Sequence, residues 1–232
     1  MRILSLNINP PDKCDGSLRS AFVSLSREIR IERVATLIQD KKPDIIFFIE
    51  QWYPVYGGVK ESLKDNYTFC YPRGFTPSRK TKSGFLSFSG VVASVNKTIT
   101  DFSYKDGTHY VYKNAKWLCL TIHEEKYLCV HYPQPKDDWE SFNDGVAKYA
   151  TEEHPVVIMG DFNTPQGRAI KITDYADVMA ENEPTFAAQT KLDYIFVQRE
   201  CQKDAHAENI VNVRNPNSSS FFSDHSATLL VI

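Results

Sequence analysis

The sequence lacks long apolar runs, and neither charge sign is in excess. Its longest apolar run covers residues 45–49, far fewer than the roughly 18 residues that a membrane-spanning helix needs. The first residues are interrupted by Ser5 and Asn7, so we expect no export signal and no contact with a membrane. The formal net charge is −2 over 232 residues, which excludes a broadly basic protein that coats nucleic acid through its overall charge.

Cysteine is scarce as well. There are five cysteines, an odd number, and no two of them have the CxxC spacing, so neither a zinc site nor a disulfide framework is indicated. Cys119 and Cys129 lie in apolar, strand-like runs and are predicted to be reduced core residues. This use of cysteine predicts a reducing, cytoplasmic location.

The composition that remains is that of a folded domain. Apolar residues make up 42 % of the chain and charged residues 24 %, which is typical of globular proteins and unlike disordered ones. No linker divides the chain, and α/β folds of this length occur as single units. We therefore expect one catalytic domain over residues 1–232.

Strands and helices alternate irregularly along the chain. The helical periodicity is clearest at 24–40, where apolar residues recur at i, i+3, i+4 and i+7. Antiparallel hairpins mixed with helices favour an α/β sandwich over a doubly wound parallel sheet. The predicted elements are strands at 2–8, 44–50, 88–95, 117–122, 127–132, 156–159, 192–197 and 227–232, and helices at 24–40 and 137–153.

One pattern recurs: an apolar strand ends at a polar side chain that could bind a metal. Strand ends are where a rigid scaffold can direct several side chains into one cleft. Carboxylate and amide oxygens suit Mg²⁺, Mn²⁺ or Ca²⁺, and histidines beside carboxylates suit proton transfer. Each residue alone could be an ordinary strand end, but together they predict metal-assisted hydrolysis at a phosphate. The residues are Asn7, Glu50, His131, Asp161, Asn163, Asp193, Asp224 and His225.

The same residues lie in motifs that resemble the endonuclease/exonuclease/phosphatase superfamily, which includes pancreatic-type deoxyribonucleases, abasic-site nucleases and phosphatases. The resemblance covers nearly the whole chain. It implies a four-layer, deoxyribonuclease I-like α/β sandwich of two packed mixed sheets with helices outside. The matching motifs are LSLNIN at 4–9, PDII at 43–46, IE at 49–50, VHYP at 130–133, GDFNTP at 160–165, KLDYIF at 191–196 and SDH at 223–225.

The resemblance also implies a metal site. Glu50 is expected to be the principal ligand, with Asn7 nearby and Asp224 on the same side. Mg²⁺ is the expected cofactor, with Mn²⁺ or Ca²⁺ as alternatives, and the number of metal ions is left open.

Catalytic roles follow from the same resemblance. Asp161 is expected to orient or deprotonate the attacking water, and Asn163 to steady that water and the phosphoryl oxygens. His225 is expected to contact the scissile phosphate, with Asp193 as its carboxylate partner. Such a pairing fixes the imidazole tautomer and raises its basicity.

Position 131 distinguishes subfamilies. Abasic-site nucleases have tyrosine at the matching place, whereas a histidine is similar to deoxyribonuclease I-like and phosphatase-like members. His131 is therefore expected to act as a general acid or to stabilise the phosphate. No carboxylate partner for His131 can be placed. The region where such a partner is expected lies within residues 66–100, and this stretch contains no acidic residue.

That acid-free segment suggests the substrate. It has a local charge of +5, and its loop at 72–84 could follow a phosphate backbone, although a solvated loop is the alternative. The leading hypothesis is a monomeric, metal-dependent DNA endonuclease with little sequence preference; DNA is favoured over RNA. The alternatives are a hydrolase of small phosphate esters and a non-catalytic binding module. The candidate substrate-binding residues are Arg73, Arg79, Lys80 and Lys82.

Overall fold

The computed structural model describes residues 1–9, 25–73, 75, 87–108, 115–134, 138–164, 169–179, 184–186, 190–210 and 222–232. Two six-stranded sheets pack face to face in this part of the chain. The first has the strand order β11 (His206–Asn209), β12 (Thr228–Val231), β1 (Arg2–Asn7), β2 (Ile45–Trp52), β4 (Ser87–Asn96), β3 (Tyr67–Cys70). The second has the order β5 (Phe102–Thr108), β6 (Ala115–Ile122), β7 (Glu125–His131), β8 (Val157–Asp161), β10 (Asp193–Gln198), β9 (Tyr175–Asp177).

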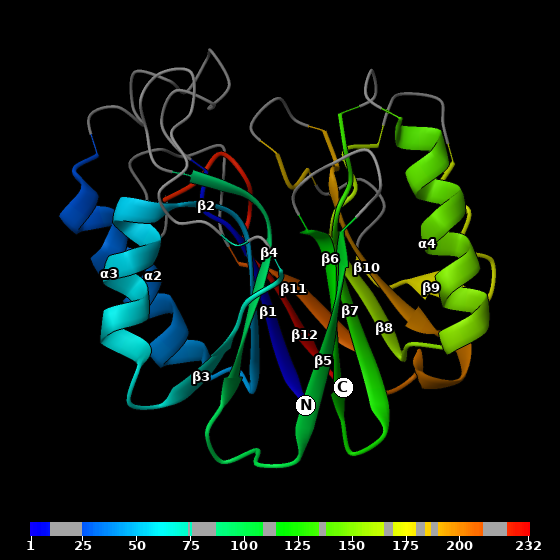
Figure 1. The fold of residues 1–232 in the computed structure, drawn as a ribbon, viewed down its shortest axis with the longest axis horizontal. Helices are drawn as coiled ribbons and strands as arrows, with labels where there is room; N and C mark the ends of the chain where they lie inside the picture. Colours follow the sequence, from blue (N-terminus) through cyan, green and yellow to red (C-terminus); the bar gives the residue numbers. More distant parts are fainter. Residues whose placement is uncertain are drawn as a thin grey trace.

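Helices cover both outer faces (Figure 1). α2 (Arg27–Lys41) and α3 (Tyr53–Leu63) lie on the first sheet, and α4 (Trp139–Glu153) lies on the second. A short 3₁₀ helix, η2 (Arg199–Cys201), follows β10. Three apolar clusters fill the spaces between the resulting four layers. The predicted four-layer α/β sandwich is confirmed.

Both sheets are mixed. β1 pairs with β2 in parallel, and β7 pairs with β8 in parallel, while the other strand pairs are antiparallel. The first and last strands are neighbours, since Ile3 pairs with Leu230. Both termini therefore lie at one end of the sandwich, and the carboxyl ends of β1, β2, β7 and β8 lie at the other.

Helix α2 shows how the sequence sets its own boundaries. Ser26 caps its amino terminus by accepting a hydrogen bond from the backbone N–H of Ile29, as serine commonly does. Lys42 ends it in a left-handed conformation, with φ of 46°, directly before Pro43, which disfavours further helix. The helix predicted at 24–40 is thus confirmed, and its first turn begins at Arg27.

The strands predicted at 117–122 and 127–132 are confirmed as β6 and β7, which form an antiparallel hairpin. β6 and β7 are joined by His123 and Glu124, which have φ of 49° and 71°. Positive φ at both central residues is the conformation that matches the twist of antiparallel strands. The other predicted strands and the helix predicted at 137–153 correspond to β1, β2, β4, β8, β10, β12 and α4.

Four strands and one helix were not predicted. α3 follows β2 without an intervening loop and contains Gly57 and Gly58, which have poor helix propensity. Its inward residues, Val55, Val59 and Leu63, are buried against the first sheet, so tertiary packing outweighs local preference. The unpredicted strands are β3, β5, β9 and β11.

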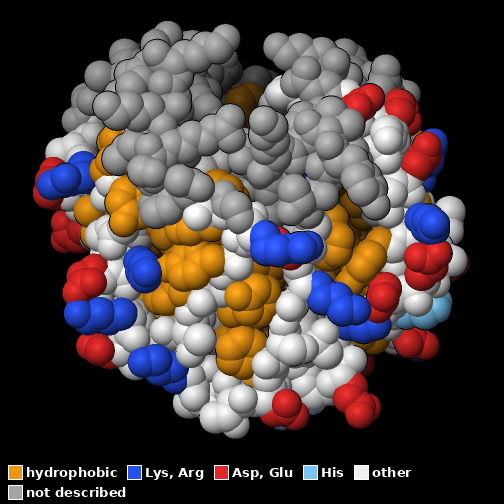
Figure 2. Space-filling view, viewed as in Figure 1, with side chains coloured by type: hydrophobic (Ala, Val, Ile, Leu, Met, Phe, Trp, Pro, Cys, Tyr) orange, Lys and Arg blue, Asp and Glu red, His pale blue; other side chains and the backbone are white. Residues whose placement is uncertain are grey.

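The surface mixes apolar and charged groups. On the face shown in Figure 2, apolar side chains gather in the middle, and basic and acidic side chains are interspersed along both flanks. Among the described residues, no helix is long and apolar enough to cross a membrane.

Candidate active site

The candidate site lies at one end of the space between the two sheets. Along each inner strand face, apolar residues alternate and then give way to a polar side chain. On β8, Val157 and Met159 belong to the inter-sheet core, and Asp161 is the next residue on that face. Because side chains alternate with a period of two, the same rule places the end residues of the neighbouring strands in the same region. These residues are Asn7, Ser89, Lys116, His131, Asp161 and Asp193.

Glu50 reaches this region through a β-bulge. The alternation of β2 directs Ile46 and Phe48 outward to the helices, so a regular strand would direct Glu50 outward too. Instead the pairing with β4 shifts between Ile49 and Gln51, and Glu50 has φ of 50°. A bulge re-aims a side chain at the cost of backbone strain. Glu50 consequently lies within 3.8 Å of the His131 ring.

Three predicted residues form a row across the second sheet. In the strand register, His131 pairs with Asp161, and Asp161 pairs with Asp193. His131 Nε2 is 3.8 Å from Asp161 Oδ2 and 3.8 Å from Glu50 Oε1. All three residues of the row are at most 4 % exposed, so their mutual electrostatic effects are only weakly screened by water.

His225 completes this row from the segment before β12. Its Nδ1 is 3.0 Å from Asp193 Oδ2, and its Nε2 is 3.9 Å from Asp161 Oδ2. The ring of Phe186 lies 4.8 Å from the imidazole. Burial opposes the charged form of His225, but the carboxylates of Asp193 and Asp161 outweigh burial and raise its pKa to about 10. The ring is therefore a cation at neutral pH.

Asp161 is a buried carboxyl group with other carboxyl groups close to it. Burial, together with Asp193 and Glu50, raises the pKa of Asp161 to about 7, while His225 and the backbone N–H of Asn163 oppose the rise. A carboxyl group with a pKa near the working pH is suited to accept a proton from water.

Asn163 is held by a network on the same side of Asp161. Its backbone N–H donates to Asp161 Oδ1 at 2.9 Å, and its Nδ2 donates to the carbonyl of Tyr132 at 2.9 Å. Gln134 Nε2 donates to Asn163 Oδ1 at 2.9 Å. Gly160 lets β8 lie close to β7 at this point, since a Cβ at residue 160 would lie 2.1 Å from the carbonyl oxygen of Val130.

The other predicted metal residues, Asn7 and Asp224, lie on or beside the first sheet. Asn7 is the register partner of Ile49, the neighbour of Glu50. Asp224 accepts a hydrogen bond from Asn9 Nδ2, two residues beyond Asn7. Arg30 supports both segments, since it donates to the carbonyls of Asn9 and Phe222, each at 2.9 Å.

Comparison with known proteins assigns the family. The sequence matches the model of the Endonuclease/Exonuclease/phosphatase family over residues 21–225. The chain belongs to this family. Its members hydrolyse phosphate esters and depend on divalent metals, so the chain is a phosphoester hydrolase. No curated protein matches the sequence significantly.

Solved structures share the fold at low identity. D. rerio TDP2 in complex with a single-strand DNA product has 15 % identity and a TM-score of 0.67, with 99 % of this chain and 97 % of that chain covered. The human Nocturnin catalytic domain with bound sulfate has 13 % identity and a TM-score of 0.66, with 99 % and 93 % covered. The Bacteroides thetaiotaomicron mannosyl-6-phosphatase Bt3783 has 15 % identity and a TM-score of 0.60, with 100 % and 98 % covered.

The residues present fit a divalent metal as the family implies. Asn7 is 2 % exposed, and within the described chain neither its Oδ1 nor its Nδ2 has a hydrogen-bonding partner. Buried amides are rarely left without partners, and an amide oxygen in this position beside β2 fits the ligand preference of a hard divalent cation.

A second group of metal-competent atoms belongs to Asp161, Asp193 and His225, whose ligand atoms lie within 4.8 Å of one another. In this group the His225 ring is paired with the Asp193 carboxylate through Nδ1 at 3.0 Å. We use the term metal side for the part of the site with the residues predicted to bind the metal, which are Asn7, Glu50 and Asp224.

Several site residues were missed by sequence reasoning. Lys116 lies on the inner face of β6, the same face as Leu118. Ser89 lies on the inner face of β4, the same face as Val91. A lysine on the apolar face of an alternating strand was a signal that could have found Lys116. Gln134 and Phe186 follow no such pattern, since both lie outside the strands.

The predicted basic loop is only partly described. Arg79, Lys80 and Lys82 lie outside the described residues. Arg73 contacts Asp106 through its Nε at 3.2 Å and lines a groove of about 460 Å³ beside α4, on the outer face of the second sheet. Phe75 packs on Tyr71, with ring centres 4.6 Å apart, so neither residue is placed with the catalytic row.

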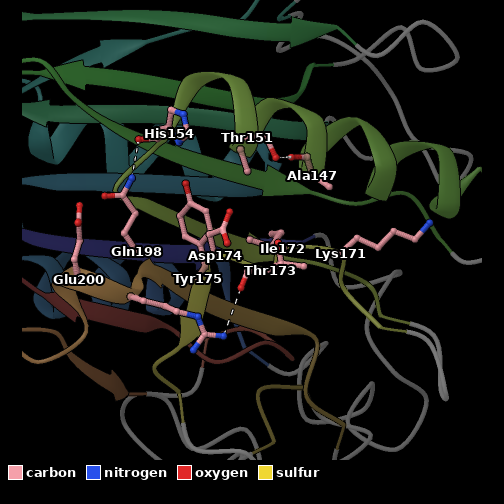
Figure 3. A pocket seen from close by; sticks show the side chains of 12 residues that line it. Ala147, Thr151, His154, Lys171, Ile172, Thr173, Asp174, Tyr175, Gln198 and Glu200 are labelled. Atoms are coloured by element: carbon pink, nitrogen blue, oxygen red, sulfur yellow. Dashed lines mark hydrogen bonds between the residues drawn. The ribbon is translucent and has the colours of Figure 1, made fainter.

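Another pocket, of about 330 Å³, lies between α4 and the strands β9 and β10 (Figure 3). Its rim includes His154, Lys171 and Arg199, and Arg199 donates to the carbonyl of Thr173. The rim mixes charges and includes none of the predicted site residues.

Proposed function

We propose that this family member is a Mg²⁺-dependent phosphodiesterase that cleaves DNA as an endonuclease with little sequence preference. The observation that supports the proposal is the buried row of His131, Asp161 and Asp193 with His225 across it. We further propose that the chain acts as one catalytic domain, which the pairing of β1 with β12 supports, and that it acts as a monomer.

The chemistry assigns a separate task to each group. Asp161 accepts a proton from water as the water oxygen bonds to phosphorus and the bond to the leaving oxygen breaks. Asn163 and the imidazolium of His225 donate hydrogen bonds to phosphoryl oxygens, whose negative charge grows in the transition state. Glu50, Asn7 and Asp224 would hold the metal ion, which supplies a Lewis acid that neutralises phosphate charge.

Plasmid nicking tests this proposal. Purified protein with Mg²⁺ or Mn²⁺ should relax supercoiled plasmid, and EDTA should stop the reaction. Asp161→Ala should lose on the order of 10³-fold or more in rate, whereas Asp144→Asn, at an exposed ion pair with Lys171, should keep the wild-type rate. A fully active Asp161→Ala protein would contradict the assigned role.

The preference for DNA depends on the basic segment at 66–100. Replacing Arg79, Lys80 and Lys82 together should weaken binding to DNA and flatten its salt dependence, because each lost phosphate contact changes the log–log slope by roughly 0.9. An unchanged slope would show that this segment does not contact the polymer.

A small phosphate ester is the second candidate substrate, and Lys116 favours it. This lysine adds a buried positive charge at the site. A phosphomonoester carries nearly two negative charges at neutral pH, so it gains more from an added cation than a singly charged diester. Turnover of a chromogenic phosphate monoester, with plasmid left intact, would favour this candidate.

A further inference from the structure

Lys116 links the two halves of the candidate site. It is 6 % exposed, and its Nζ lies 3.3 Å from His131 Nδ1 and 3.1 Å from Ser89 Oγ. The Ser89 hydroxyl lies 3.4 Å from Glu50 Oε1. A chain of polar contacts therefore runs from His131 on the second sheet to Glu50 on the first.

The chemistry of an ammonium group limits how it can contact an imidazole. Lysine has three donor hydrogens and no acceptor, so the contact with Lys116 requires His131 Nδ1 to be the acceptor. A neutral imidazole then carries its proton on Nε2. In His131, Nε2 is the nitrogen that faces Glu50 Oε1 and Asp161 Oδ2, each at 3.8 Å.

The two histidines of the site thus have opposite partners. His225 has the carboxylate of Asp193 at Nδ1, which calls for a proton on that nitrogen. His131 has an ammonium at the same ring position. The two rings therefore differ at Nδ1, which faces a carboxylate oxygen in His225 and an ammonium group in His131.

We propose that Lys116 is a positioning residue that keeps His131 in the Nε2–H tautomer, so that His131 donates a hydrogen bond to a phosphoryl oxygen. Ser89 holds the Lys116 ammonium from the other side and joins it to Glu50. His131 then stabilises the phosphate and does not protonate the leaving group. This inference rests on the proposed hydrolase function.

Nitrogen NMR of the imidazole tests the tautomer without any activity measurement. In metal-free wild-type protein labelled with ¹⁵N-histidine at neutral pH, His131 should show an unprotonated Nδ1 and a protonated Nε2. Lys116→Met should change this pattern, and Lys126→Met, on the next strand, should leave it unchanged. A protonated Nδ1 in the wild type would overturn the proposal, and so would a Lys116→Met spectrum identical to that of the wild type.

Kinetics test whether Lys116 acts through His131. Lys116→Met should lower kcat on the order of 10- to 100-fold, as the loss of an orienting partner commonly does, with little change in KM. The double variant with His131→Ala should be no slower than His131→Ala alone. Additive losses together with a raised KM would mean that Lys116 contacts the phosphate directly, which would overturn a positioning role.

The two measurements separate this inference from the proposed function. If wild-type protein hydrolyses no phosphate ester, the proposed function fails while the NMR result still decides the tautomer. If Lys116→Met does not fold, the wild-type spectrum alone remains decisive.

Discussion

Asp161 and Asp193 are direct register partners on β8 and β10. Two buried carboxylates side by side repel each other, and like charges directly opposite one another destabilise a sheet. His225 contacts both of them and supplies the compensating positive charge. The stability of this end of the sandwich is therefore coupled to the charge of one imidazole.

Stability should fall at alkaline pH because of this coupling. The pKa of His225 is raised from its ordinary 6.5 to about 10, so its contribution is complete below pH 6.5 and is lost as the pH rises through about 10. Urea unfolding in EDTA should show the advantage of wild type over His225→Gln shrinking between pH 7 and pH 10. A constant difference across that range would mean that the folded-state pKa is not raised.

Asp161 predicts a second pH effect of the same sign, at lower pH. Its pKa is raised from 3.8 to about 7, so the folded state binds a proton more tightly than the unfolded state. The stability contribution of Asp161 therefore decreases as the pH rises from about 4 through 7. In metal-free protein, carboxyl ¹³C NMR should show one aspartate titrating near pH 7, which is absent in Asp161→Asn.

Added Mg²⁺ should then lower that midpoint, because a nearby cation favours the carboxylate form. An Asp161 signal that titrates near its ordinary value and does not respond to Mg²⁺ would contradict both the burial argument and the placement of the metal near this row.

Much of this arrangement was predictable from the sequence because apolar strands end at polar residues. The rule found Asn7, His131, Asp161 and Asp193, and it works because the alternation of a strand continues unchanged to its end. It reached Glu50 as a strand-terminal acid, although a regular β2 would direct that side chain away from the site. The bulge that redirects Glu50 has no sequence signal of its own.

The rest depends on tertiary contacts. Lys116 was missed although it shares a strand face with Leu118, since pairing with His131 is decided by how β6 lies against β7. α3 was missed because Gly57 and Gly58 disfavour a helix locally, while burial of Val59 and Leu63 against the first sheet compensates. Such long-range packing is not encoded in local periodicity.

Asn7→Leu should separate stability from metal binding. The Asn7 amide is buried without partners in the described chain, so an apolar side chain of similar size should stabilise the metal-free protein by about 1 kcal/mol. Metal affinity should fall about 10-fold or more, measured by calorimetric titration with Mn²⁺. A destabilised variant with unchanged Mn²⁺ affinity would show that the amide serves the fold and not a metal.

Arg30 should be essential to the fold around the metal side of the site. Its guanidinium is fully buried, lies 5.0 Å from the ring centre of Trp52 and donates to the carbonyls of Asn9 and Phe222. Arg30→Met leaves both carbonyls without these donors, which should cost about 3 kcal/mol in the free energy of unfolding. Activity and Mn²⁺ affinity should fall too, because Asn9 holds Asp224.

Arg27→Met on the same helix is the control. It removes an exposed ion pair and should change stability by less than about 0.5 kcal/mol. Equal losses in the two variants would mean that Arg30 contributes only helix propensity, whereas the contacts of Arg30 predict a loss confined to its own variant.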